Sequence, residues 1–410
     1  MVMQNSDDPA ATSLHSDVAI TGSVAHKIGK EMTTPSTSMS KMELQNLINT
    51  MERLELGTYQ RELVSNISST APSNDVGRQL FDTGLRLMMA YQHEMAALYF
   101  HACIEVTPQA ALAHGLMALC HGPNYNFKGE LYYHSSNHEE DRNLPDLQCA
   151  FPSQQVADRH SAAAMAIIEE LQHPDQEQQR DEYHESNNQG NNGDMNDKGN
   201  DSQHSTTTES ISDVEVQLLS AIRILMGTPG VDPNVSDELV GRPFANAMRD
   251  VYRKYPDDPD MAYFFAEALM VLNAWQLYEY PSGKALSADV EEIREVLERA
   301  LQNHPHHPGL LHLYAHLSEM SSQPERALSM CEPLRTMFPH AGHLIHMQTH
   351  IDVLLGHYDA CVRSNLDAIR ADMYTMQISP STAGRETLYF GYIVVRRAQC
   401  CWHRTCFFLY

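Results

Sequence analysis

The feature of this sequence that most constrains its fold is an interval of 34 residues that recurs in the C-terminal half. Pro305 and Pro339 are 34 residues apart, and each follows a run of apolar residues at helical spacing, as expected of a proline that ends a helix. The same interval separates two pairs of histidines, His312 from His346 and His316 from His350. Such a period predicts pairs of helices that stack on one another, because a single pair cannot bury its apolar face alone.

The rest of the chain also has the pattern of helices. Apolar residues recur at helical rather than alternating spacing, and alanine and leucine are frequent while runs of valine, isoleucine and threonine are few. We therefore predict an all-α protein. Near the N-terminus, the spacing of apolar residues across 40–67 predicts one amphipathic helix.

Particular places within the period carry a resemblance to a known family. In the N-terminal half the eighth, twentieth, twenty-fourth, twenty-seventh and thirty-second places of one unit hold Gly84, Ala96, Phe100, Cys103 and Pro108. In the C-terminal half the corresponding eighth, twentieth and thirty-second places hold Ala315, Ala327 and Pro339. This pattern resembles the tetratricopeptide repeat. The resemblance implies a solenoid of degenerate helical hairpins, in which small residues let two helices approach and a large apolar residue fills the gap between neighbours.

A longer part of the sequence resembles a largely uncharacterised group of tetratricopeptide-like proteins from bacteria and microbial eukaryotes. The resemblance covers residues 80–135 and 240–395 and includes the runs HEMAALYF, HGPNYNF, HPGLLHLYAHLSE and GHLIHMQTHI. It implies a shared fold and no particular reaction. Members of the group usually continue with further helices where this chain has residues 396–410, so we expect an atypical tail there.

Composition divides the chain into segments. Residues 171–213 contain ten acidic and two basic residues and almost no large apolar side chain, so they cannot bury a core. We predict a disordered N-terminus at 1–40, an N-terminal helical part with one tetratricopeptide-like unit at 41–170, an acidic disordered linker at 171–213, C-terminal tetratricopeptide-like repeats at 214–395, and the tail at 396–410.

The repeated histidines are the leading candidates for a functional site. In tetratricopeptide repeats, the second, fifth, ninth and twelfth places of the first helix face a concave groove. The resemblance therefore implies that eight polar side chains line such a groove: Tyr263, Glu267, His312, His316, Glu319, His343, His346 and His350. Helical geometry independently places His312 and His316 on one face, because residues four apart are neighbours on a helix surface.

Two interpretations of these residues remain open. In the first, the protein is a binding scaffold whose histidine-lined groove recognises a protein, a peptide or a small ligand. In the second, it is a metal-binding protein or a metal-dependent enzyme, in which His312, His316, His346 and His350 hold a divalent zinc, iron or manganese ion and Glu267 or Glu319 supplies a carboxylate. Neither interpretation identifies a reaction, so the sequence specifies no catalytic residue.

Three further features have both a structural and a functional interpretation. The run from Gly122 to Asn126 either only turns the chain or reaches a ligand near the groove. Trp275 is either a core residue or an aromatic side chain at the groove mouth. The histidines at 304, 306 and 307 precede a predicted helix, and we interpret them as part of a loop and a helix cap.

Charge and composition exclude several classes of partner. With 28 lysine and arginine residues against 53 aspartate and glutamate residues, the net charge is −25, which disfavours binding to nucleic acid or to an anionic membrane. No apolar run approaches the ~20 residues that span a bilayer. The eight cysteines form no C-x-x-C pair, and the N-terminus has no secretion signal. We therefore expect a cytoplasmic protein with neither nucleic acid nor membrane as a partner.

Overall fold

The computed structural model describes residues 39–61, 76–126, 146, 151–172, 211–226 and 237–378. All of them belong to one compact unit of the chain, residues 35–410. Apart from one two-stranded hairpin, the regular elements of these residues are helices, which confirms the all-α prediction. None of the described helices has the length and hydropathy needed to cross a bilayer.

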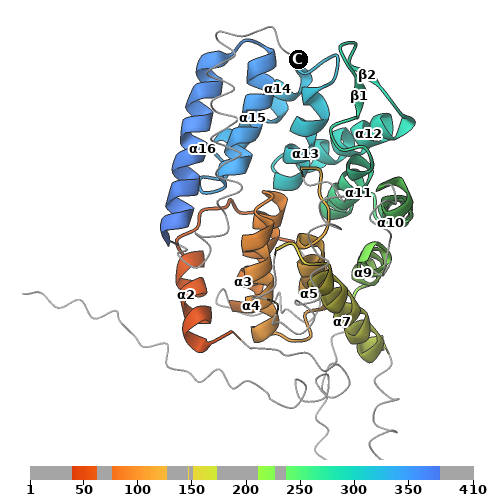
Figure 1. The fold of residues 1–410 in the computed structure, drawn as a ribbon, viewed down its shortest axis with the longest axis vertical. Coiled ribbons are helices and arrows are strands. Elements are labelled where there is room, and N and C mark those ends of the chain that lie inside the picture. Colours follow the sequence, from red (N-terminus) through yellow and green to blue (C-terminus); the bar gives the residue numbers. More distant parts are fainter. Residues whose placement is uncertain are drawn as a thin grey trace, which may run out of the picture. The chain divides into compact units, whose positions relative to one another are not determined.

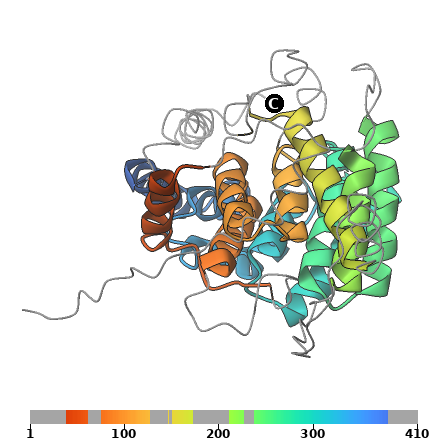
Figure 2. The same cartoon turned by 90° about the horizontal axis from the view of Figure 1, so that it is seen from below.

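The elements follow one another along the chain and pack largely on their sequence neighbours (Figure 1). The N-terminal helices are α2 (Lys41–Met51), α3 (Val76–Met89), α4 (His93–Val106), α5 (Ala111–Cys120), α7 (Gln154–Gln172) and α9 (Asp213–Met226). The next elements are α10 (Asp237–Lys254), α11 (Pro259–Leu272), the antiparallel strands β1 (Tyr278–Glu279) and β2 (Lys284–Ala285), and α12 (Ala288–Asn303). The last are α13 (Pro308–Glu319), α14 (Arg326–Met330), the 3₁₀-helix η3 (Glu332–Arg335), α15 (Gly342–Leu354) and α16 (Tyr358–Ile378). Figure 2 shows α7, α9 and α10 side by side.

The first predicted unit shows why small residues recur at fixed places. A Cβ atom at Gly84 of α3 would lie 2.9 Å from a ring carbon of Phe100 in α4, closer than side chains normally approach. Phe100 is fully buried. The absence of a side chain at Gly84 thus lets α3 and α4 pack closely around the aromatic ring.

Two helices that carry predicted groove residues, α11 and α13, begin with side-chain caps. The side chain of Asp258 accepts the backbone N–H groups of Asp260 and Met261 at the start of α11. At the start of α13, Nδ1 of His307 accepts the backbone N–H of Leu310 at 3.1 Å. The interpretation of His307 as a helix cap is confirmed, and both helices have a proline in their first turn, where its missing N–H costs nothing.

The helix predicted over residues 40–67 is shorter than expected. It ends with α2, and residues 54–61 continue without helical structure. Arg61 is buried and forms ion pairs with Asp258 at 3.0 Å and with Asp260 at 2.5 Å. Residues 54–61 thus do not form the helix that their apolar spacing favours, because tertiary contacts to the start of α11 hold this segment in another conformation.

The N-terminal and C-terminal helices share one core. A single cluster of buried apolar side chains extends from Leu47 in α2 to Ile351 in α15. In addition to the sequential pairs, α3 packs against α13. Consequently the helix that bears His312 and His316 is covered by a helix from the other side of the predicted linker.

Parts of the segments predicted from composition lie outside the described residues. These are the N-terminus up to residue 38, residues 173–210 of the predicted linker, and everything after residue 378, including the predicted tail. The two edges of the predicted linker are helical, because α7 continues to Gln172 and α9 begins at Asp213.

Candidate metal centre

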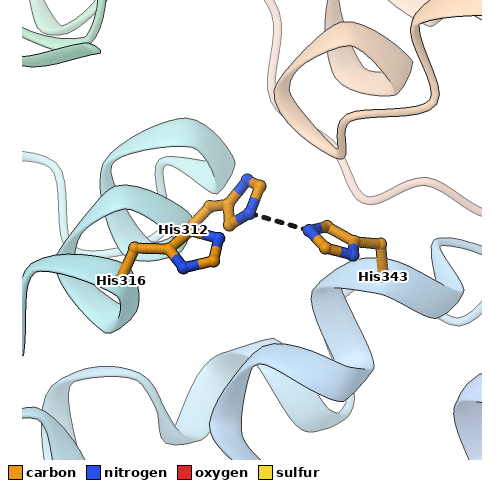
Figure 3. Close-up of side chains that lie close together, drawn as sticks. All are labelled: His312, His316 and His343. Atoms are coloured by element: carbon orange, nitrogen blue, oxygen red, sulfur yellow. Dashed lines mark hydrogen bonds between the residues drawn. The ribbon is translucent and has the colours of Figure 1, made fainter. Parts of the chain in front are cut away.

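Three histidines from two neighbouring helices form a compact group, which we call the triad. His312 and His316 lie one turn apart on α13, and His343 lies in the first turn of α15 (Figure 3). One ring nitrogen from each histidine lies within 4.8 Å of the other two, and Nε2 of His343 is 3.0 Å from Nε2 of His312. All three side chains are at most 1% exposed. Three converging imidazoles are a ligand set found in metal sites that keep one coordination position open.

Two rings of the triad are oriented by acceptors on their outer side. Nδ1–H of His312 donates to the backbone carbonyl of Met89 at 2.8 Å, and Nδ1–H of His316 donates to the carboxylate of Glu319 at 2.8 Å. In a neutral imidazole with its proton on Nδ1, Nε2 carries the lone pair. Histidines that bind metals almost always make such an outer hydrogen bond, which fixes the tautomer and the orientation of the ring.

His346 and His350 lie beside the triad rather than within it. The ring centroid of His350 is 5.6 Å from that of His316, and the centroid of His346 is 6.1 Å from that of His343. Where the sequence suggested His346 and His350 as ligands with His312 and His316, the structure brings His343 into the group of three nitrogens. The residue that joins the group thus lies one helical turn before His346 on the same face of α15.

His346 and His350 also each make a hydrogen bond through Nδ1. Nδ1–H of His350 donates to the second oxygen of Glu319 at 2.5 Å. Nδ1–H of His346 donates to the side-chain oxygen of Asn365 at 2.7 Å, because the amide nitrogen of Asn365 is turned toward the carbonyl of Cys361. Glu319 therefore connects the triad to the second pair of repeated histidines.

The charges around the triad favour a cation. Burial lowers the pKa of His312 and of His343 well below the usual range, and the neighbouring imidazoles lower both further. These two rings are therefore neutral at pH 7 and do not have to lose an added proton before they bind a metal. Burial alone would raise the pKa of Glu319, but His350 and His316 hold it well below its usual range. A negatively charged carboxylate thus lies beside the triad.

The predicted carboxylate Glu267 and its neighbour Tyr263 lie on α11, outside the three-nitrogen group. Burial raises the pKa of Glu267 above its usual value, although the side chains of Tyr263 and Tyr91 act in the opposite direction. The carboxyl oxygen Oε1 of Glu267 is buried. Glu267 therefore holds its proton more strongly than an ordinary glutamate, and Tyr91 links it to the triad.

The turn between α3 and α4 delivers two groups to the triad. The backbone N–H of Tyr91 donates to the carbonyl of Met88, and the N–H of Gln92 donates to the carbonyl of Leu87. This is the Schellman pattern of a helix end. Tyr91 occupies the position that is usually glycine in this pattern. The φ angle of Tyr91 is 55°, a backbone conformation that a bulky side chain rarely adopts. The same turn leaves the carbonyl of Met89 directed at His312.

The strained residues of the described chain both touch the triad. The ring centroid of Tyr91 is 4.2 Å from that of His312 and 5.7 Å from that of His343. Trp275, with a φ of 64°, has its ring centroid 5.6 Å from that of His316. Among the described residues, these are the two non-glycine residues with positive φ. Strain of this kind persists where the surrounding structure requires it and is concentrated at functional sites.

The run from Gly122 to Asn126 also reaches the triad. Tyr125 is fully buried, and its ring centroid is 4.9 Å from that of His316. The amide nitrogen of Asn126 is 3.5 Å from Nε2 of His343. The loop therefore does more than turn the chain.

Tyr91, in contrast, was not predicted from the sequence. The only signal of its role there is a helix that ends without a glycine.

Comparison with protein-family models and with curated protein sequences finds no match to this chain. The assignment of a function therefore depends on the geometry of the histidines and of the residues that hold them.

Proposed function

We propose that this protein binds one divalent transition-metal ion through His312, His316 and His343. The observation that carries the proposal is the convergence of three buried ring nitrogens within 4.8 Å of one another. Outer hydrogen bonds from Met89 and Glu319 support it, because they direct the lone pairs of two of the rings away from those acceptors. Imidazole ligands suit zinc and iron better than manganese, which prefers oxygen.

The burial of the histidines favours a metal centre over a groove that recognises a protein, a peptide or another ligand. A recognition groove presents its side chains to solvent, whereas the repeated histidines are between 0 and 8% exposed. The 34-residue interval and the sequential helix pairs support a tetratricopeptide-like arrangement of the hairpins. In this proposal, the inner side chains of two neighbouring hairpins bind an ion rather than a peptide.

The same geometry suits a catalytic as well as a structural metal. Three protein ligands leave a coordination position at which a bound ion can activate water. Burial raises the pKa of Glu267, so this carboxyl group keeps its proton more readily than an ordinary glutamate. Tyr91, Tyr125 and Trp275 surround the triad with aromatic rings and restrict the access of water. We propose no substrate.

The proposal is tested by the metal content of the full chain. Protein is loaded with excess Zn²⁺, passed over a desalting column with a moderate chelator, and analysed by elemental mass spectrometry. We expect about one tightly held equivalent in the native protein and its loss in His343→Ala, with affinity lowered more than about 100-fold, because even an outer partner is worth 10- to 100-fold. His306→Ala, at an exposed histidine, is the matched control and should keep the metal. A native protein with less than a tenth of an equivalent would contradict the proposal.

A further inference from the structure

A second group of histidines lies among the N-terminal helices. His101 is on α4, His114 is on α5, His121 directly follows α5, and His160 is on α7. His101, His121 and His160 are buried, and His114 is partly exposed. His160 interacts electrostatically with each of the other three imidazoles, so the four rings form one group. None of these residues follows the 34-residue interval of the triad.

The centre of this group repeats the arrangement of the triad. Nδ1 of His114 lies 2.8 Å from Nδ1 of His160. On the opposite side of the His160 ring, Nε2 lies 3.0 Å from a carboxylate oxygen of Asp146, and Arg159 holds the other oxygen of that carboxylate at 2.5 Å. As in the triad, two ring nitrogens face each other while an acceptor, here a carboxylate and there the backbone carbonyl of Met89, orients one of the two rings from outside.

The positions of the protons follow from these contacts. His160 and Arg159 keep the pKa of Asp146 below its usual range in spite of burial, so Asp146 accepts and Nε2 of His160 donates. In a neutral ring, Nδ1 of His160 then carries the lone pair, and it faces His114. Without a metal, the contact is satisfied by the proton of His114. When the proton of His114 is on Nε2 instead, the two Nδ1 atoms face each other with their lone pairs.

His101 adds a third imidazole to the group. Neither of its ring nitrogens makes a hydrogen bond with any residue that the structure describes, and the side chain is only 7% exposed. The closest acidic oxygen is that of Glu105, 3.5 Å from Nε2. A buried polar group without a partner is destabilising, so native proteins rarely keep one without a ligand or a water molecule.

We infer that His114 and His160 form a second site for a divalent transition-metal ion, separate from the triad. The two Nδ1 atoms are the ligands, and Asp146 orients His160 from outside. With two ring nitrogens in contact instead of three, this site binds more weakly than the triad. Because His114 is partly exposed, its ion exchanges with solvent.

The test is a titration with Co²⁺, followed by visible absorption, in protein whose triad has been disabled by His343→Ala. We expect this variant to bind about one equivalent of Co²⁺ and the His343→Ala/His160→Ala variant to bind none over the same range. His160→Gln, which keeps a side chain that can donate to Asp146, should also abolish binding. The matched control is His121→Ala in the same background, because Nδ1 of His121 already accepts the backbone N–H of Ser153.

Two results would overturn the inference. One is a His343→Ala protein that gains no Co²⁺ absorption up to about tenfold excess; the other is binding that persists after His160 has been replaced. Failure of the triad proposal gives a different result, because the native protein and His343→Ala would then bind the same amount of metal. Circular dichroism of each variant separates loss of a ligand from loss of the fold.

Discussion

The two histidine groups of this chain are built by different routes. Two members of the triad, His312 and His316 on α13, belong to the histidine pairs that recur at 34 residues. The third, His343 on α15, does not, and the three bring ring nitrogens within 4.8 Å. The second group takes His114 and His160 from α5 and α7, at no regular interval, and brings two nitrogens to 2.8 Å. A repeated sequence pattern can thus place several histidines on one helix face. A site without such a pattern depends on how the individual helices pack against one another.

The backbone around the two groups differs as well. Tyr91 and Trp275, the described non-glycine residues with positive φ, both contact the triad. The members of the second group on α4, α5 and α7 lie in ordinary helix. The difference indicates that aromatic rings are held at the triad at the expense of local backbone strain.

The largest expected effect concerns this strain. Tyr91→Ala removes a buried ring and should lower the free energy of unfolding by about 3–5 kcal/mol. Tyr91→Gly should be less destabilising than Tyr91→Ala by about 1 kcal/mol, because glycine adopts positive φ without strain. At Tyr99, a buried residue in the middle of α4, the order should be reversed by about the same amount, because glycine weakens a helix. Urea unfolding of the four variants measures both differences, and equal stability of the two Tyr91 variants would show that the turn is unstrained.

The second prediction separates the outer carboxylates of the two groups. Glu319→Gln should weaken tight metal binding at the triad about 10- to 100-fold, because Glu319 orients His316 and holds His350. Asp146→Asn should leave this tight binding unchanged, because Asp146 contacts His160. Competition with a chromophoric chelator measures both affinities. Equal losses in the two variants would indicate a general loss of structure instead of a local role.

The third prediction concerns acid pH and the buried histidines of both groups, together with the buried His93 at the start of α4. Burial lowers the pKa of His93 to about 4 and that of His121 to about 3, and it lowers those of His312 and His343 as well. Below the unfolded-state value of about 6.5, the unfolded chain takes up protons that the native chain does not. Stability should therefore be constant above about pH 7 and fall as the pH drops below 6.5.

The pH dependence of stability can be assigned to individual buried histidines. Each buried histidine contributes at most ~1.4 kcal/mol per pH unit within its window. Denaturant unfolding of the metal-free protein between pH 7 and 5 measures how steeply the free energy of unfolding changes with pH. His343→Ala should reduce this slope by the contribution of one histidine. Stability that rises on acidification would contradict the neutral state inferred for these buried rings.

The sequence predicted the helical fold and much of the triad for a physical reason. Helical spacing and the 34-residue interval depend on local geometry, which repeats wherever the sequence repeats. His312 and His316 therefore share a face of α13, as expected. The helix expected through residue 67 was too long, because Arg61 pairs with Asp258 and Asp260, which are almost 200 residues away in the sequence.

The second group could not be predicted in this way. His114 and His160 are 46 residues apart, and no pattern relates them to each other or to Asp146. Only the packing of α5 against α7 brings their rings together.

By itself, the sequence determined that the chain is helical and which histidines lie on the same face of each helix. The tertiary structure decided that His343, not His346, meets His312, because the offset between neighbouring hairpins is set by packing and not by the period. It also decided that Met89 and Tyr91 would cover the triad. These residues lie more than 220 positions earlier in the chain than His312, and only the packing of α3 on α13 brings them to it.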